Sequence, residues 1–169
     1  MSRRREAVLV VTLALVTTAA LTYPLAFRLG DGGRVDSDDG LWSIWIVAWV
    51  ARTVVVEPTR LFDANIFHPH PNTLAYSEAN LVAGVLAAPA YWLTGNIYAA
   101  HNSAVLLSFV LAFVGAYLLV KRLTGSLPAG IVAAVLFTFC PFIFARSPHI
   151  QLLITAGIPF SMLAFHRLV

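Results

Sequence analysis

Long apolar stretches without Asp, Glu, Lys or Arg dominate the chain, at residues 7–27, 103–120, 127–145 and 150–166. A helix needs about 20 mainly apolar residues to cross the hydrocarbon core of a bilayer, which is about 30 Å thick. Hydrophobic residues make up 59% of the sequence and charged residues only 11%, which excludes an ordinary soluble domain. We therefore expect an all-α, polytopic helical membrane protein with about four transmembrane helices.

The first stretch, residues 7–27, directly follows a basic N-terminus that contains Arg3, Arg4 and Arg5. A cleavable signal peptide is the alternative, but the stretch is long for one and no clean small-x-small site precedes the next loop. The positive-inside rule holds the arginines in the cytoplasm. The N-terminus is therefore expected inside, and the chain from Arg28 onward outside.

A shorter apolar stretch, Leu81–Leu93, contains Pro89 and is too short to cross the membrane easily. If it does not cross, Lys121, Arg122 and Arg167 lie in the cytoplasm together with the N-terminal arginines. If it crosses, all three lie outside. The positive-inside rule therefore favours a segment that stays at the interface.

This topology leaves residues 28–102 as one large outer loop. Within it we predict two interfacial helices, at about 41–56 and 81–93. The first carries three aromatic rings spaced three and four residues apart, on one helical face, as tryptophans at a membrane interface often are. These are Trp42, Trp45 and Trp49. Packing against the transmembrane helices would explain the same residues.

Seven of the eight carboxylates lie between Asp31 and Glu78, inside this loop. Asp36, Asp38 and Asp39 stand immediately before the tryptophan-bearing helix. Capping and first-turn stabilisation account for one such acid, and three exceed that need. Glu78 stands at the start of the second interfacial helix, where capping is again the alternative to a functional role.

Histidines supply the other candidate polar groups. His68 and His70 flank a proline and would need a carboxylate to complete a metal site. His149 and Gln151 lie beside Arg146 at the outer turn before the last apolar stretch, in the same compartment as the acidic loop. A histidine at the end of a span is often only an interfacial residue, and the facing acids are what suggest a function.

Taken in chain order, these features resemble the N-terminal part of the GT-C-type membrane glycosyltransferases. That superfamily includes protein mannosyltransferases, aminoarabinose transferases and oligosaccharyltransferases. The resemblance covers essentially all of residues 1–169. Within the superfamily, the chain is similar to a bacterial branch. It is carried by DGLWSIWIVAW (Asp39–Trp49), LFDANIFHPHPNTLAYSE (Leu61–Glu78), LTGN (Leu93–Asn96) and LLVKRLTGS (Leu118–Ser126). Because GT-C enzymes generally have many more spans, the chain looks like an N-terminal portion that need not act alone.

The resemblance implies a catalytic base in the first outer loop, which falls on Asp39, with Asp38 as the alternative. The Glu that closes the loop falls on Glu78, and in some relatives this residue helps hold a divalent cation or a donor group. Relatives often carry an acid in the second outer loop, where this chain has RSPHIQ instead, so the use of a metal stays open. The expected substrate-binding residues are Glu78, Arg146, His149 and Gln151, and Glu78 and His149 are the expected ligands of a divalent metal ion.

The resemblance further implies transfer of a sugar from a polyprenyl-phosphate donor, at the outer face of the bacterial inner membrane. A glycan, a lipid or a protein would be the acceptor, and no basic patch interleaved with aromatic residues indicates nucleic acid. A transporter or flippase subunit is one alternative, although such proteins typically carry ionisable groups within their spans. A non-enzymatic membrane assembly protein is the other, but it would not need acids before the tryptophan helix.

Overall fold

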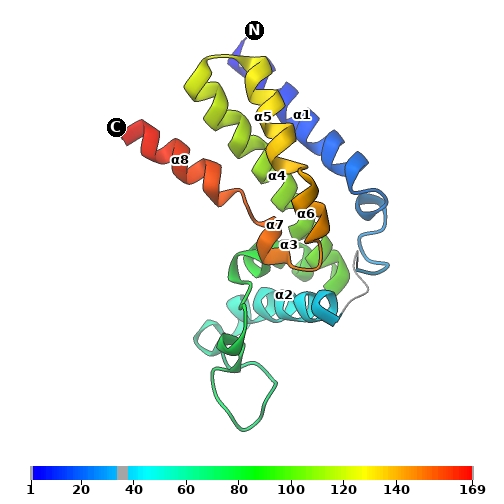
Figure 1. The fold of residues 1–169 in the computed structure, drawn as a ribbon. Coiled ribbons are helices and arrows are strands. Elements are labelled where there is room, and N and C mark those ends of the chain that lie inside the picture. The colour runs from blue at the N-terminus through cyan, green and yellow to red at the C-terminus, as the bar shows by residue number, and fades with distance from the viewer. Residues whose placement is uncertain (1, 34–37, 169) are drawn as a thin grey trace. The chain divides into compact units, whose positions relative to one another are not determined.

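Every regular element is helical in the part of the chain that the computed structural model describes, residues 2–33 and 38–168 (Figure 1). The predicted all-α fold is confirmed. The α-helices are α1 (Arg3–Leu21), α2 (Asp38–Val56), α3 (Leu81–Thr94), α4 (Ile97–Thr124), α5 (Leu127–Thr138), α6 (Pro141–Ala145), α7 (Ile150–Leu153) and α8 (Gly157–Leu168). Short 3-10 helices are η1 (Leu25–Phe27), η2 (Pro58–Arg60) and η3 (Thr73–Tyr76).

Three helical segments among the described residues are long and apolar enough to cross a membrane, as expected for a membrane protein. They are Asp38–Val56, Ile97–Thr124 and Leu127–Ala145. The last two contain the stretches that we predict to be spans at 103–120 and 127–145. The first is α2, for which we predict an interfacial position, and its length and composition suit a span as well.

The two remaining predicted spans have different helix boundaries from those expected. In the first, α1 begins earlier, at Arg3, and ends at Leu21, because Pro24 disfavours helical backbone at the residue before it and cannot donate a hydrogen bond. In the last, residues 150–166 are divided between α7 and α8. Pro159 has no N–H to bond the carbonyl of residue 155, which favours a break in the helix before it.

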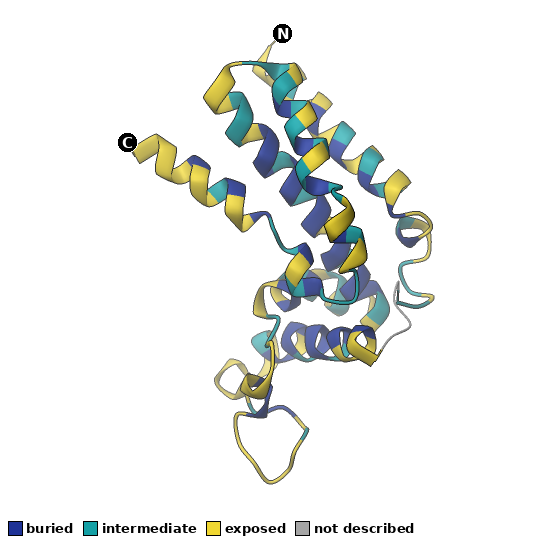
Figure 2. Ribbon diagram, viewed as in Figure 1, coloured by how far each residue is buried: buried dark blue, intermediate teal, exposed yellow. Residues whose placement is uncertain are grey.

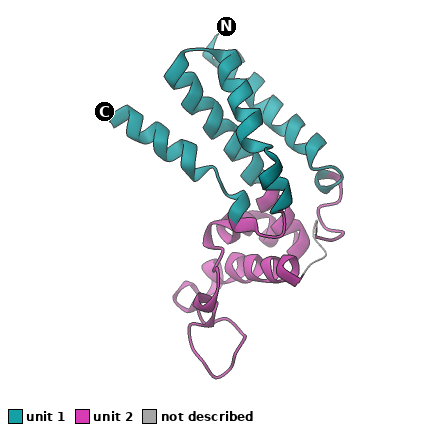
Figure 3. Ribbon diagram, viewed as in Figure 1, with its two compact units in different colours: residues 1–26, 106–146, 152–169 teal, residues 27–105, 147–151 magenta. Residues whose placement is uncertain are grey.

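The chain divides into two compact units (Figure 3). The first comprises residues 1–26, 106–146 and 152–169, and the second comprises residues 27–105 and 147–151.

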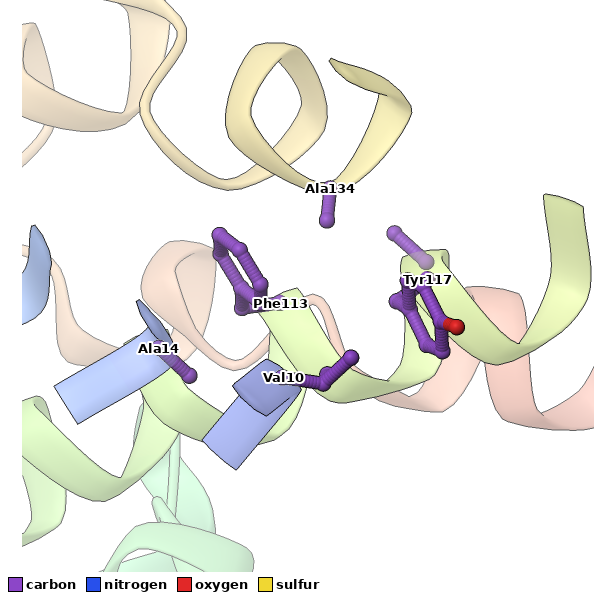
Figure 4. Close-up of a cluster of buried hydrophobic side chains, with 6 residues drawn as sticks. Val10, Ala14, Phe113, Tyr117 and Ala134 are labelled. Carbon is purple, nitrogen blue, oxygen red and sulfur yellow. The ribbon is translucent and has the colours of Figure 1, made fainter. Parts of the chain in front are cut away.

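The core of the first unit joins α1, α4 and α5 (Figure 4). Its buried members are Val10, Ala14, Phe113, Ala116, Tyr117 and Ala134. Small residues allow the helices to approach closely, since a Cβ on Gly130 would lie only 2.9 Å from the Tyr117 ring. The Tyr117 hydroxyl donates a 2.6 Å hydrogen bond to Glu6 Oε1, and Lys121 Nζ lies 3.7 Å from the same oxygen. These contacts fix the start of α1 against α4.

In the second unit, α2 packs on α3, and nine of the 19 residues of α2 are buried (Figure 2). A Cβ on Gly84 would lie 2.2 Å from Val50 Cγ1, so the two helices meet at a point where only glycine fits. Trp92 Nε1 donates to the Ala51 carbonyl at 3.1 Å and ties the other end of α3 to α2. The chain after α2 is held by a second cluster, whose buried members are Ile46, Val50, Ala64 and Leu74.

Candidate functional site

Four of the predicted site residues line one cavity of the second unit, with a volume of about 380 Å³. They are Asp39, Glu78, His149 and Gln151. Trp42, Ser43, Ser77, Asn80 and Pro148 complete the lining. Residues from the predicted outer loop at 28–102 and from the 147–151 segment therefore meet at one polar site.

The first wall of this cavity is the N-terminal end of α2. Asp39 is the second residue of the helix, where a carboxylate is stabilised by the helix dipole. Trp42 and Ser43 follow three and four residues later, which places all three side chains on the same helical face. The helix thus presents a carboxylate, an aromatic ring and a hydroxyl to one cavity.

The second wall is the segment between η3 and α3. The Ser77 hydroxyl donates a 2.7 Å hydrogen bond to Glu78 Oε2. This bond, together with the backbone N–H of Glu78 and the charge of His149, lowers the pKa of Glu78 below its ordinary value of 4.5 and outweighs the opposing effect of burial. Glu78 is therefore a carboxylate at neutral pH and accepts hydrogen bonds there.

The third wall carries His149, whose Nε2 lies 3.8 Å from Asp39 Oδ2. This distance is longer than a hydrogen bond, so the two groups form an ion pair only while His149 is protonated. The Asp39 side chain is 70% exposed, and the pair is accordingly weak as a source of stability. Its significance is that an acid and a base share one open cavity.

The other predicted residues lie elsewhere. Asp38 does not line this cavity, although it is the neighbour of Asp39. Asp36 lies outside the residues that the structure describes. Arg146 belongs to the first unit, and its guanidinium carbon lies 5.9 Å from the centre of the Phe142 ring. Its predicted role as a substrate contact stays a prediction.

Metal binding by Glu78 and His149 also stays a prediction. Among residues 2–33 and 38–168, no three His, Cys, Asp or Glu side chains are grouped so that they could hold a metal ion. A divalent cation at this cavity would have to draw further ligands from amide oxygens, such as those of Gln151 and Asn80, or from a substrate.

Among the cavity residues that were not predicted as site residues from the sequence, two have buried polar atoms without a partner, Ser43 and Asn80. The Ser43 side chain is 3% exposed, and neither its Oγ nor the buried Asn80 Oδ1 has a hydrogen-bond partner among the described residues. Buried polar atoms are nearly always paired, so these two are candidates to bond a ligand in the cavity. The spacing of Ser43 from Asp39 could have revealed it, whereas Asn80 resembles an ordinary structure-breaking residue.

Comparison with protein-family models, with curated proteins and with solved structures finds no match to the chain.

Proposed function

We propose that the protein is a membrane glycosyltransferase, or the N-terminal part of one, that moves a sugar from a polyprenyl-phosphate donor to an acceptor. The observation that supports this proposal is the convergence of Asp39, Glu78, His149 and Gln151 on one cavity of sugar size. In the proposed topology the N-terminus lies in the cytoplasm, and the cavity opens at the outer face of the bacterial inner membrane. The acceptor is a glycan, a lipid or a protein with a free hydroxyl or amide.

In the proposed reaction Asp39 is the general base. It takes the proton from the acceptor as the acceptor oxygen or nitrogen attacks the anomeric carbon, while the bond from that carbon to the phosphate oxygen breaks. The products are the glycosylated acceptor and polyprenyl phosphate. A positioned base of this kind contributes about 10²–10⁴-fold to the rate.

The remaining residues of the cavity bind and orient. The Glu78 carboxylate accepts hydrogen bonds from sugar hydroxyls, and the Gln151 amide donates or accepts them. His149, whose Nε2 lies 3.8 Å from Asp39 Oδ2, places a polar side chain beside the proposed base. Arg146 remains the residue predicted from the sequence to neutralise the departing phosphate.

Asp39→Asn tests the assignment, because it removes the base while keeping the shape of the side chain. We expect the transfer of labelled sugar, in membranes that contain the protein and its lipid-linked donor, to fall about 10²-fold or more. Asp38→Asn is the matched control, since Asp38 is the adjacent acid and does not line the cavity. Both variants should be produced in amounts equal to the unsubstituted protein.

Retained transfer in Asp39→Asn would rule out Asp39 as the base. A transporter subunit or a non-enzymatic assembly protein, the two alternative functions, would show no such transfer. An assembly protein would also tolerate the double substitution of Asp39 and Glu78 without loss of its cellular role.

A further inference from the structure

The second unit contains another cavity, of about 570 Å³, that shares no residue with the Asp39 cavity. It is lined by the C-terminal part of α2, from Trp49 to Thr53, and by the chain that follows, from Glu57 to Pro71. Thirteen residues separate Asp39 from Arg52, which is about 20 Å along an α-helix at 1.5 Å per residue. One small molecule cannot occupy both cavities, so the second is an independent site.

The walls of this second cavity are fixed by hydrogen bonds. Trp49 Nε1 donates to the Leu61 carbonyl at 2.9 Å, and the Thr73 hydroxyl donates to the Ala64 carbonyl at 2.9 Å. Asp63 Oδ1 accepts a bond from the Asn72 backbone N–H, also at 2.9 Å. The segment after α2 is thus held in one conformation, as a preformed ligand site requires.

Of the two arginines that line the cavity, only one forms ion pairs with described residues. Arg60 lies between two acids, with Nη1 3.5 Å from Glu57 Oε2 and Nε 3.9 Å from Asp63 Oδ2. Arg52 makes no ion pair with any residue that the structure describes. His68 and His70 line the same cavity and offer further N–H donors. The unneutralised guanidinium of Arg52 is therefore available to an anion.

A buried hydroxyl supplies the second observation. Thr53 lines the cavity and is 3% exposed, yet its Oγ1 has no hydrogen-bond partner among the described residues. A hydroxyl in a helix usually bonds the carbonyl four residues earlier when nothing else is available. Buried hydroxyls rarely lack a hydrogen-bond partner. The Thr53 hydroxyl is therefore available to bond a ligand in the cavity.

We propose that this second cavity binds a phosphate group carried on a hydroxylated small molecule. Arg52 holds two phosphate oxygens through its planar guanidinium, and Thr53 bonds the third oxygen or the neighbouring hydroxyl. A phosphate suits the site better than a carboxylate, because donors converge from α2 and from the following segment, and a phosphate offers three terminal oxygens. A soluble sugar phosphate and an anionic lipid headgroup share this chemistry.

Binding is measured on the full chain, purified and placed in phosphatidylcholine nanodiscs. One arm titrates glucose 6-phosphate, and the other replaces part of the phosphatidylcholine with phosphatidylglycerol and measures the lipid dependence of thermal stability. We expect Arg52→Gln to weaken binding about tenfold or more. The matched control is Arg28→Gln, which changes an exposed arginine of the same unit that does not line the cavity.

Thr53→Val keeps the shape of the side chain and removes only the hydroxyl. We expect it to weaken binding several-fold while the melting temperature of the unliganded protein stays the same or rises, because an unpaired buried hydroxyl is removed. A purely structural role for Thr53 would lower the melting temperature instead. Asp39→Asn should leave this binding unchanged, which separates the site from the proposed transferase cavity.

The two arms identify the source of the phosphate. A response to glucose 6-phosphate that Arg52→Gln abolishes supports a soluble ligand, and a response to phosphatidylglycerol that it abolishes supports a lipid headgroup. Equal effects of Arg52→Gln and Arg28→Gln would overturn the proposal, since they would indicate general electrostatic attraction. Absence of binding in both arms would overturn it as well.

Discussion

Ser77 lowers the pKa of Glu78 through a hydrogen bond of 2.7 Å to its carboxylate. Since this bond is the largest cause of the lowered pKa of Glu78, Ser77→Ala should raise that pKa toward its ordinary value of 4.5. The change can be measured by NMR titration of glutamate side-chain carbons, because the chain contains only three glutamates. Ser161→Ala, a serine of the other unit, should leave the Glu78 titration unchanged.

The lowered pKa of Glu78 also makes the stability of the folded protein depend on pH. A carboxyl group whose pKa is lower in the folded than in the unfolded state adds stability above its unfolded pKa, and loses it as the pH falls through the folded pKa. For Glu78 this contribution is complete above about pH 4.5 and disappears below it. Ser77→Ala should therefore reduce the acid dependence of the melting temperature, and an unchanged dependence would contradict the role given to the hydroxyl.

At the scale of single residues, the sequence predicts part of the site. Asp39 and Glu78 could be selected because acids are scarce in so apolar a chain, and His149 and Gln151 because they were expected in the same compartment as those acids. The resemblance placed the base on Asp39 with Asp38 as the alternative, and only the fold shows that Asp39 alone of the two lines the cavity. The pairing of buried hydroxyls, which points to Ser43, is likewise a property of the folded chain alone.

At the scale of elements, the contact between α2 and α3 depends on Gly84. A methyl group there would lie 2.2 Å from Val50 Cγ1, well inside van der Waals contact. We expect Gly84→Ala to destabilise the protein by about 1–3 kcal/mol, the usual result of overpacking a core. Thermal or denaturant unfolding, followed by tryptophan fluorescence, measures the change.

Two further variants make the Gly84 result specific. Gly32→Ala makes the same chemical change in the same unit, at a site where nothing lies within 4 Å of the added Cβ, and should have little effect. Val50→Ala removes the opposing side chain, so the double variant Gly84→Ala/Val50→Ala should recover part of the lost stability relative to the sum of the single changes. Strict additivity would show that the two residues do not meet.

Helix boundaries were less predictable than helix content. Apolar runs gave α4 and the α5–α6 segment, because their length alone requires helices in a membrane. The interruption between α7 and α8 depends on Pro159, which stands inside a run whose composition is otherwise continuous. For α2, the spacing of the tryptophans predicts an interfacial helix. The folded helix, Asp38–Val56, is also long and apolar enough to cross a membrane.

For the whole molecule, amino-acid composition indicates the class, a helical membrane protein. The division into two units depends on contacts between distant residues, which composition alone does not predict. Residues 147–151 belong to the same unit as residues 27–105, although apolar segments on both sides of them belong to the other unit. This grouping is what gathers His149 and Gln151 with Asp39. Without coordinates, the same residues could be assigned to one compartment but not to one cavity.

The membrane topology can be tested at the start of α2, in the segment between α2 and α3, and near the end of α4. We expect single cysteines that replace Asp39 and His70 to react with a membrane-impermeant thiol reagent on intact cells, because residues 28–102 are predicted to form one outer loop. A cysteine that replaces Arg122 should react only after permeabilisation, since Lys121 and Arg122 are predicted to lie in the cytoplasm. The background is Cys140→Ala, which removes the single native cysteine and should itself give no labelling.

The alternatives give different labelling patterns. If only one of the positions 39 and 70 reacts, α2 crosses the membrane and its two cavities face opposite compartments. A transferase cavity at Asp39 and a phosphate site at Arg52 would then serve different pools of ligand. If positions 39, 70 and 122 all react on intact cells, α2 does not cross the membrane but Leu81–Leu93 does, and the interfacial position predicted for α3 is wrong. If position 39 is protected while position 122 reacts, Asp39 faces the cytoplasm, and an externally presented lipid-linked sugar cannot reach it.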